Sequence, residues 1–128
     1  MELVVVDTSV VIDYLRGQSP LLLKLLERQK DKKLKLLLPA VVWLELEVGA
    51  SMENMEIHEK VASLLSPIER IEVNEEQAVL AGQLIRRKKI LTDPVDTLIA
   101  AAAVKKGAKL VTLNVKHYKN IPNLKLYK

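Results

Sequence analysis

Cysteine is absent from this chain of 128 residues, and histidine occurs only twice. Without cysteine, the fold cannot depend on disulfide bonds, and a thiolate zinc site is excluded. Two histidines cannot form a histidine-rich metal site by themselves. Glycine is also scarce, and the turn after the first apolar run contains none, which excludes the glycine-rich phosphate loop of a dinucleotide-binding domain.

Long apolar runs are missing as well. The longest uncharged run, Leu36 to Leu44, is far too short to span a bilayer, and the first residues include Glu2 and Asp7 where a signal peptide would carry Lys or Arg. No linker rich in Gly, Ser or Pro interrupts the sequence, and 49% of the residues are hydrophobic. We therefore expect residues 1–128 to form a single domain of a cytoplasmic protein without membrane contact.

Positive charge is concentrated in the last third of the sequence. Residues 1–35 carry seven basic and five acidic side chains, residues 36–85 two and nine, and residues 86–128 eleven and two, so the net charges are +2, −7 and +9. The last block begins with Arg86, Arg87, Lys88 and Lys89. Such a block would attract a polyanion such as nucleic acid, although basic helix ends exposed to solvent would give the same pattern.

Hydrophobic patterning predicts alternating strands and helices. Strands are expected at residues 3–6, 36–38, 68–73 and 109–112, with a last edge strand at 124–127. Helices are expected between them, ending near 16 and then spanning 21–32, 40–50, 52–65, 75–89 and 94–106. Asn74 with Gln77 forms a capping-box pattern, and Asp93, Pro94 and Gly107 mark the two ends of the last helix. The alternation favours an α/β fold with a parallel sheet covered on both faces.

The first predicted strand, Leu3 to Val6, ends on a carboxylate. Asp7 follows it directly, and Thr8 and Ser9 come next. Because ligands of parallel sheets bind beyond the carboxyl ends of the strands, Asp7 is placed where a ligand would lie. Asp7 could equally cap the helix that follows, which is a common role of Asp. Asp13, later in this helix, is expected to face solvent or to pair with Arg16.

Two predicted helices each turn one carboxylate toward the core. At about 100° per residue, Glu45 lies at the centre of the apolar arc formed by Val41, Val42, Leu44, Leu46 and Val48. Asp96 shares its helix face with Ile99, Ala100, Ala103 and Val104. Asp96 could instead be the reciprocal member of a capping box with Asp93, although Glu or Gln is preferred there. Glu45 has no helix end to cap.

Buried carboxylates are costly unless they are protonated, paired or bound to a cation. Asp7, Glu45 and Asp96 would converge on one edge of the sheet, where the two histidines could not neutralise all three. A hard divalent cation satisfies them together, since Mg²⁺ and Mn²⁺ prefer oxygen ligands. We therefore interpret these three acids as a catalytic metal site for Mg²⁺ or Mn²⁺. The side chains expected to orient a ligand or a bound water are Thr8, Ser9, Thr112 and Asn114.

A family resemblance appears in three stretches of the chain, VVVDTSVVIDYL, WLELEVGA and DTLIAAAAVKKGAKLVTLNVKHYKNIP. In this order they resemble the PIN-domain family, and specifically the small VapC-type toxins of prokaryotic toxin–antitoxin pairs. The resemblance implies a three-layer α/β/α sandwich with a central parallel sheet, an acidic site for Mg²⁺ or Mn²⁺, RNA as substrate, a homodimer, and inhibition by a small antitoxin. It places the metal-site acids on Asp7, Glu45 and Asp96.

The chain departs from the family pattern after the strand that ends at Thr112. Family members usually offer a fourth acid there, either where Asn114 stands or three residues later in an Asp-Phe pair, where this chain has His117 and Tyr118. An amide oxygen carries no charge, which weakens the case for a second metal ion. We expect a metal-dependent endoribonuclease that holds RNA through Arg86, Arg87, Lys88 and Lys89. The alternative is a catalytically weak PIN module that binds RNA or a protein partner.

Overall fold

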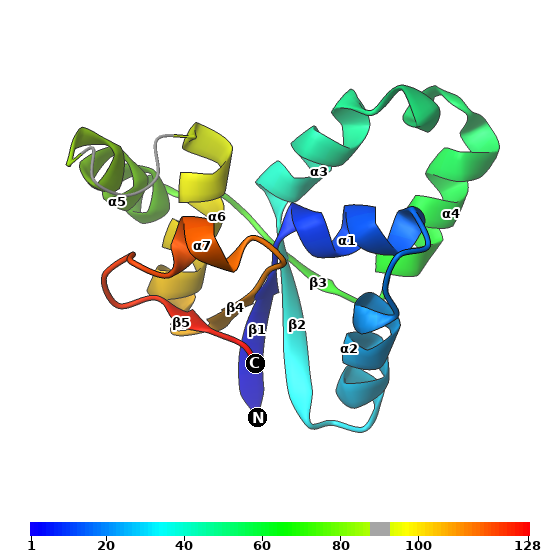
Figure 1. Ribbon diagram of the computed structural model, residues 1–128, viewed down its shortest axis with the longest axis horizontal. Helices are drawn as coiled ribbons and strands as arrows, with labels where there is room; N and C mark the ends of the chain where they lie inside the picture. The colour runs from blue at the N-terminus through cyan, green and yellow to red at the C-terminus, as the bar shows by residue number, and fades with distance from the viewer. Residues whose placement is uncertain (88–92) are drawn as a thin grey trace.

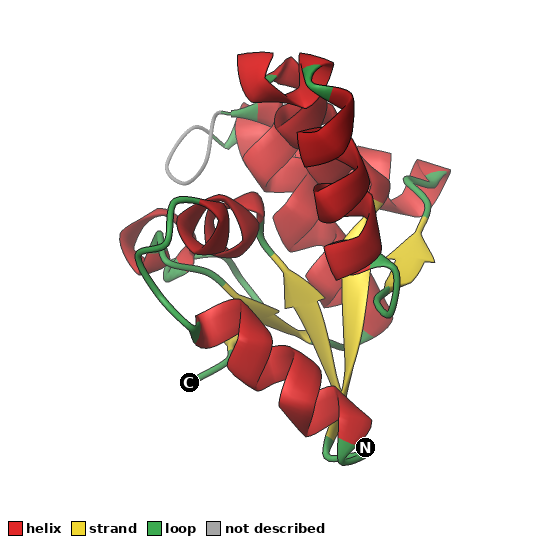
Figure 2. Cartoon of the chain, turned by 90° about the vertical axis from the view of Figure 1, so that its right-hand side faces the viewer, coloured by secondary structure: helices red, strands yellow, loops and turns green. Residues whose placement is uncertain are grey.

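The computed structural model of the protein describes residues 1–87 and 93–128. Its centre is a five-stranded sheet in which neighbouring strands run parallel, in the order β3-β2-β1-β4-β5 (Figures 1 and 2). The strands are β1 (Glu2–Val6), β2 (Leu34–Pro39), β3 (Glu69–Ile71), β4 (Lys109–Val111) and β5 (Lys125–Leu126). The predicted α/β fold with a parallel sheet is confirmed.

The central strand β1 is buried on both faces and marks the reversal of strand order. Val4, Val5 and Val6 are all 0% exposed, as expected for a β-branched run inside a parallel sheet. From β1 the chain builds outward through β2 to β3, and then returns to place β4 on the other side of β1. Such a reversal opens a crevice at the carboxyl ends of the two strands concerned. The residues that follow β1 and β4 therefore lie where α/β proteins bind ligands.

Helices cover both faces of the sheet, so the predicted three-layer sandwich is confirmed (Figure 1). On one side lie α1 (Thr8–Leu15), α2 (Leu21–Lys30) and α4 (Met55–Leu65). On the other side lie α5 (Glu75–Arg86), α6 (Pro94–Lys106) and α7 (Val115–Tyr118). Helix α3 (Ala40–Val48) follows β2 directly and continues past the carboxyl end of that strand, and the 3-10 turn η1 (Ala50–Glu53) comes next.

Helix α6, which carries Asp96, begins and ends as predicted. The Oδ1 atom of Asp93 accepts hydrogen bonds from the backbone N–H groups of Val95 and Asp96, at 2.9 and 3.0 Å. Pro94 is the first helical residue, and Gly107 follows the last turn with φ of 63°, a conformation that glycine adopts without strain. Asp93 therefore caps the helix, which leaves the carboxylate of Asp96 free for another role.

The structure differs from the predicted elements in three places, namely at β3, before α4 and after β4. Strand β3 covers only Glu69–Ile71, because it pairs with β2 over these residues alone. The helix expected at 52–65 begins later, at Met55, and residues 52–53 belong to η1. The Asn54 side chain caps α4 by accepting from the N–H groups of Glu56 and Ile57. The helix α7 was missed, because four residues are too few to show a period. The predicted end of α5 at residue 89 lies outside the described residues.

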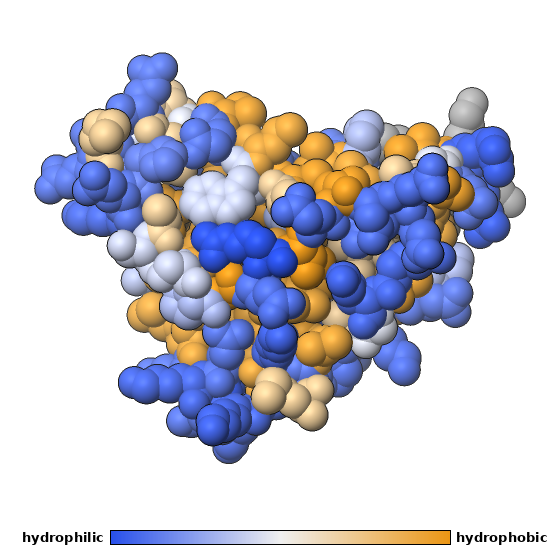
Figure 3. Space-filling view, turned by 180° about the vertical axis from the view of Figure 1, so that it is seen from behind, coloured by the Kyte–Doolittle hydropathy of each residue, from blue (hydrophilic) through white to orange (hydrophobic). Residues whose placement is uncertain are grey.

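The surface of the molecule is mixed in character. Seen from behind, hydrophilic side chains cover both flanks, and hydrophobic atoms are visible along the middle (Figure 3). Four large apolar side chains on α3 and around the start of α7 are between 46% and 78% exposed, namely Leu44, Val48, Leu113 and Val115. In the part of the chain that the structure describes, no helix has the length and apolar character needed to cross a membrane.

Candidate functional site

A cavity of about 430 Å³ lies at the carboxyl ends of β1 and β4, at the reversal of strand order. Residues that follow both strands form its wall together with side chains from α1, α3 and α6. The wall consists of Asp7, Thr8, Ser9, Ile12, Asp13, Arg16, Gln18, Glu45, Asp96, Leu113 and Asn114. The three acids selected from the sequence thus line one cavity, and Asp13 adds a fourth carboxylate.

Asp7 is only 2% exposed, and three hydroxyl groups hold its carboxylate. Ser9 Oγ and Thr112 Oγ1 donate to Oδ2, at 2.6 and 2.8 Å. The Tyr118 hydroxyl donates to Oδ1 at 3.1 Å. Asp7 occupies the N-cap position of α1, but its side chain makes no capping hydrogen bond. The Asp7 side chain therefore does not cap α1, and the capping interpretation is wrong.

Glu45 lies in the middle of α3 and is half-buried. Its Oε1 atom accepts a hydrogen bond from Thr8 Oγ1 at 2.6 Å, which links α3 to the start of α1. Val42 and Leu46 are buried, as the helical-face argument predicts. The prediction was wrong for two members of the apolar arc, Leu44 and Val48, which are 55% and 78% exposed. The reason is that α3 continues past the sheet and packs on the core with only one side.

Asp96 lies in the first turn of α6, and its side chain is 22% exposed. Its pKa is raised from 3.8 to about 6, first by burial and then by the negative charges of Asp93, Asp7 and Glu45. The Nδ1 atom of His117 lies 4.0 Å from Asp96 Oδ2. Burial is the larger cause of the raised pKa, and the nearby carboxylates of Asp93, Asp7 and Glu45 add to it.

Three of the four residues predicted to orient a ligand donate hydrogen bonds to Glu45 or to Asp7. Thr8 bonds Glu45, whereas Ser9 and Thr112 bond Asp7. Asn114 lines the cavity, and its backbone N–H donates to Thr112 Oγ1 at 2.9 Å. The Asn114 side chain does not cap α7.

Tyr118 was missed by the sequence analysis. It is 1% exposed, and its ring belongs to the hydrophobic core. Burial and the charges of Asp7 and Asp96 raise the pKa of its phenol far above the usual value, so the hydroxyl stays protonated and donates. The available signal was that Tyr118 follows the end of a strand by only six residues. A tyrosine buried there would need a hydrogen-bond partner for its hydroxyl.

Two further charged residues line the cavity, namely Asp13 in α1 and Arg16 directly after that helix. Asp13, expected to face solvent or to pair with Arg16, is half-buried in the wall. Arg16 and Gln18 line the same cavity. Their part in the cavity was missed because the local sequence suggests only that Asp13 pairs with Arg16, three residues later. The chain thus supplies one guanidinium to a cavity rich in carboxylates.

The basic run predicted to hold RNA is only partly described. Arg86 and Arg87 are exposed at the end of α5 and lie outside the cavity wall. Lys88 and Lys89 lie outside the described residues. The structure thus leaves the RNA-holding role of this run as a prediction based on charge.

The cavity offers oxygen donors of three kinds, from carboxylates, hydroxyl groups and side-chain amides. Within residues 1–87 and 93–128, no group of three His, Cys, Asp or Glu side chains could hold a metal ion as it stands. Oxygens of Asp7 and Glu45 point to hydroxyl groups instead. The donor set nevertheless fits a hard divalent cation, because the cavity offers carboxylate, hydroxyl and amide oxygens and its acids raise the pKa of Asp96.

Known proteins resemble this chain in sequence and in fold. Residues 4–122 match the PIN domain. Ribonuclease VapC19 from Mycobacterium tuberculosis (strain ATCC 25618 / H37Rv) is 31% identical over 122 residues, which cover 93% of this chain and 94% of that protein. VapBC2 from Rickettsia felis, bound to a DNA fragment from its promoter, matches with a TM-score of 0.81 and 26% identity over 98% of this chain and 97% of that chain. DNA-bound VapBC from Salmonella typhimurium has the same fold, with a TM-score of 0.81 and 20% identity over 99% and 98% of the two chains. This chain therefore belongs to the PIN-domain family.

Proposed function

We propose that this protein is a metal-dependent endoribonuclease of the VapC toxin type, which hydrolyses phosphodiester bonds of RNA. The observation that carries the proposal is that Asp7, Glu45 and Asp96 line one cavity at the reversal of strand order. Asp7 and Glu45 also contribute to the raised pKa of Asp96, so the three acids act on one another electrostatically. The name of the relative VapC19 supports ribonuclease chemistry.

The three acids would hold the cation, and hydroxyl groups around them set their orientation. When bound, Mg²⁺ or Mn²⁺ would stabilise charge on the phosphate and make a bound water more acidic. Ser9 and Thr112 restrain Asp7, and Thr8 restrains Glu45. These contacts limit the side-chain rotation that metal binding would otherwise have to restrict. The chain thus supports a defined arrangement of acids rather than a mobile acidic patch.

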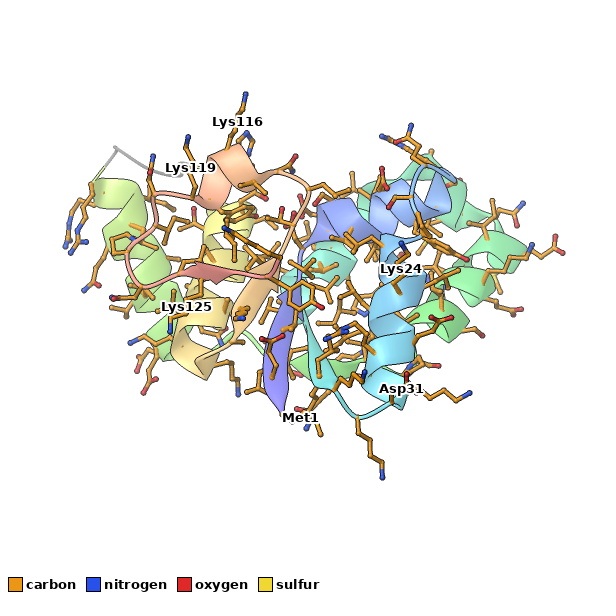
Figure 4. All side chains as sticks on the ribbon, turned by 60° about the horizontal axis from the view of Figure 1, so that its bottom comes forward. Met1, Lys24, Asp31, Lys116, Lys119 and Lys125 are labelled. Carbon is orange, nitrogen blue, oxygen red and sulfur yellow. The ribbon has the colours of Figure 1, made fainter. Side chains whose placement is uncertain are left out.

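Basic side chains near the cavity would hold the RNA backbone. Arg16 belongs to the cavity wall. Lys116 and Lys119 are exposed on and directly after α7, and Figure 4 shows both extending outward from the molecule. Asn114, the residue that precedes this helix, lines the cavity. Such contacts would neutralise phosphates and make RNA binding dependent on salt.

A small antitoxin protein is the proposed partner, and a homodimer is the proposed form of the enzyme in the cytoplasm. Structural relatives from Rickettsia felis and Salmonella typhimurium are VapBC proteins, and one from Klebsiella pneumoniae is a toxin–antitoxin complex. The exposed apolar side chains on α3 and around the start of α7 offer surface for such contacts.

The second candidate function is binding of RNA or protein by a PIN module with weak catalysis. Two observations favour it, namely that Asn114 lines the cavity without adding charge and that His117, rather than an acid, faces Asp96. A cation would then be held by fewer carboxylates than in family members that carry a fourth acid, and cleavage would be slow. RNA binding would be retained, because the exposed Lys116 and Lys119 lie outside the cavity wall that contains the acids.

RNA cleavage by the purified protein distinguishes the two candidates. Labelled single-stranded and folded RNAs are incubated in Mg²⁺ or in EDTA with the wild type, with Asp7→Asn and with the control Asp31→Asn. We expect the wild type and the control to cleave only with Mg²⁺, and Asp7→Asn to bind RNA without cleaving it. Binding without cleavage by the wild type would support the second candidate. Cleavage by Asp7→Asn would refute the assignment of the site.

A further inference from the structure

The carboxylate of Asp7 has one acceptor position left once its hydrogen bonds are counted. A carboxylate offers about four lone-pair positions, two on each oxygen. On Oδ2, both are taken by Ser9 Oγ at 2.6 Å and Thr112 Oγ1 at 2.8 Å. On Oδ1, the Tyr118 hydroxyl takes one at 3.1 Å. Among the described residues, this leaves one position on Oδ1 for a further partner.

Tyr118 differs from the other two donors in how firmly it is placed. Ser9, in the first turn of α1, and Thr112, directly after β4, are short side chains whose hydroxyl oxygens lie 3.4 Å apart. Tyr118 reaches Asp7 from α7, and its ring is 1% exposed within the core. The backbone around it is held as well, because its carbonyl accepts from the N–H of Ile121 at 3.2 Å. A hydroxyl on a fixed ring gives its hydrogen bond a fixed direction.

We propose that Tyr118 is a positioning residue, which directs Oδ1 of Asp7 so that Asp7 binds a divalent cation through this one oxygen. The inference rests on the proposed function, because it concerns the same metal site. The two oxygens of Asp7 are not equivalent: Oδ2 is occupied by two hydroxyls, whereas Oδ1 keeps one position. Partners that hold a ligand in this way typically change metal affinity by about 10- to 100-fold when they are removed.

Removing only the hydroxyl tests this role. Tyr118→Phe keeps the ring in the core, so we expect an unchanged fold and an Mn²⁺ affinity about tenfold weaker by calorimetry. Tyr127→Phe is the matched control, because Tyr127 is half-buried and is not among the described residues that donate to Asp7, namely Ser9, Thr112 and Tyr118. It should bind Mn²⁺ as the wild type does. Tyr118→Leu removes the ring as well and measures the effect of lost packing. Circular dichroism establishes that each variant is folded at the temperature of the titration.

The outcomes separate this inference from the proposed function. Wild-type Mn²⁺ affinity in Tyr118→Phe would overturn the role of the hydroxyl and leave the metal site intact. Weaker binding in Tyr118→Leu alone would overturn it too, because packing of the ring would then be the cause. If the wild type itself binds no Mn²⁺, the proposed function fails and this inference fails with it. A loss in Tyr118→Phe with an unchanged Tyr127→Phe supports the positioning role.

Discussion

Replacing Asp96 by Asn should stabilise the metal-free protein at neutral pH, by an amount that depends on pH. Folding raises the pKa of Asp96 from 3.8 to about 6, so the folded protein binds this proton more tightly than the unfolded chain does. The stability contributed by the protonated form is fully present below pH 3.8 and is lost as the pH rises through about 6. Asn has no proton to lose, so Asp96→Asn should lack this decline.

The size of the effect follows from the two pKa values. The interval from 3.8 to about 6 corresponds to at most about 3 kcal/mol. The Asp96 side chain is 22% exposed, and water screens part of the interaction. We therefore expect Asp96→Asn to raise the free energy of unfolding by about 1–2 kcal/mol at pH 7 and to leave it nearly unchanged below pH 3.8.

Urea unfolding in EDTA, measured across this pH range, provides the test. Asp31→Asn is the control, because Asp31 is exposed near the amino edge of the sheet, and Figure 4 shows it close to Met1 and far from Lys116. Mg²⁺ should stabilise the wild type more than Asp96→Asn, since the variant has lost a ligand. The reasoning is refuted if Asp96→Asn is less stable than the wild type at pH 7, or if its effect is the same at both ends of the range.

Three further predictions concern activity, metal binding and RNA binding. Asp7→Asn and Glu45→Gln should each abolish RNA cleavage in a gel assay, because each removes a charge from the cation site; a variant that still cleaves would exclude its residue. Asn114→Asp should tighten Mn²⁺ binding without RNA, because it adds a carboxylate to the cavity wall, whereas unchanged calorimetry would mean that this position takes no part. Replacing Arg86 and Arg87 by Gln together should lower the salt slope of RNA binding by about 2 if both contact phosphates; an unchanged slope would identify a solvated helix end.

The three acids could be selected from the sequence because Asp7 directly follows a strand with a strong pattern, and Glu45 and Asp96 lie on predicted helices. The buried run of β1 predicts a parallel strand, and the end of such a strand locates Asp7. The helix period then places Glu45 and Asp96 beside apolar residues. Local patterns were sufficient here, because both the strand end and the helix face are properties of a few neighbouring residues.

Other features depend on tertiary structure and could not be predicted. The exposure of Leu44 and Val48 follows from where α3 lies relative to the sheet, which the helix period does not contain. The contact between Tyr118 and Asp7 joins residues 111 positions apart through a helix of only four residues. Asp13 enters the cavity because α1 begins directly at the strand end, whereas its local neighbours suggested solvent.

The end groups of the RNA products test the central claim most directly. A labelled RNA is incubated with the wild type in Mg²⁺ and in EDTA, and the fragments are assayed for 5′-phosphate and 3′-hydroxyl ends by ligation and by phosphatase treatment. We expect these ends in Mg²⁺, because water rather than the RNA 2′-hydroxyl would attack the phosphate and the 3′-oxygen would leave. We expect no fragments in EDTA and none with Asp7→Asn. Fragments that form in EDTA, or that carry a 5′-hydroxyl and a 2′,3′-cyclic phosphate, would contradict a metal-dependent hydrolysis at Asp7, Glu45 and Asp96.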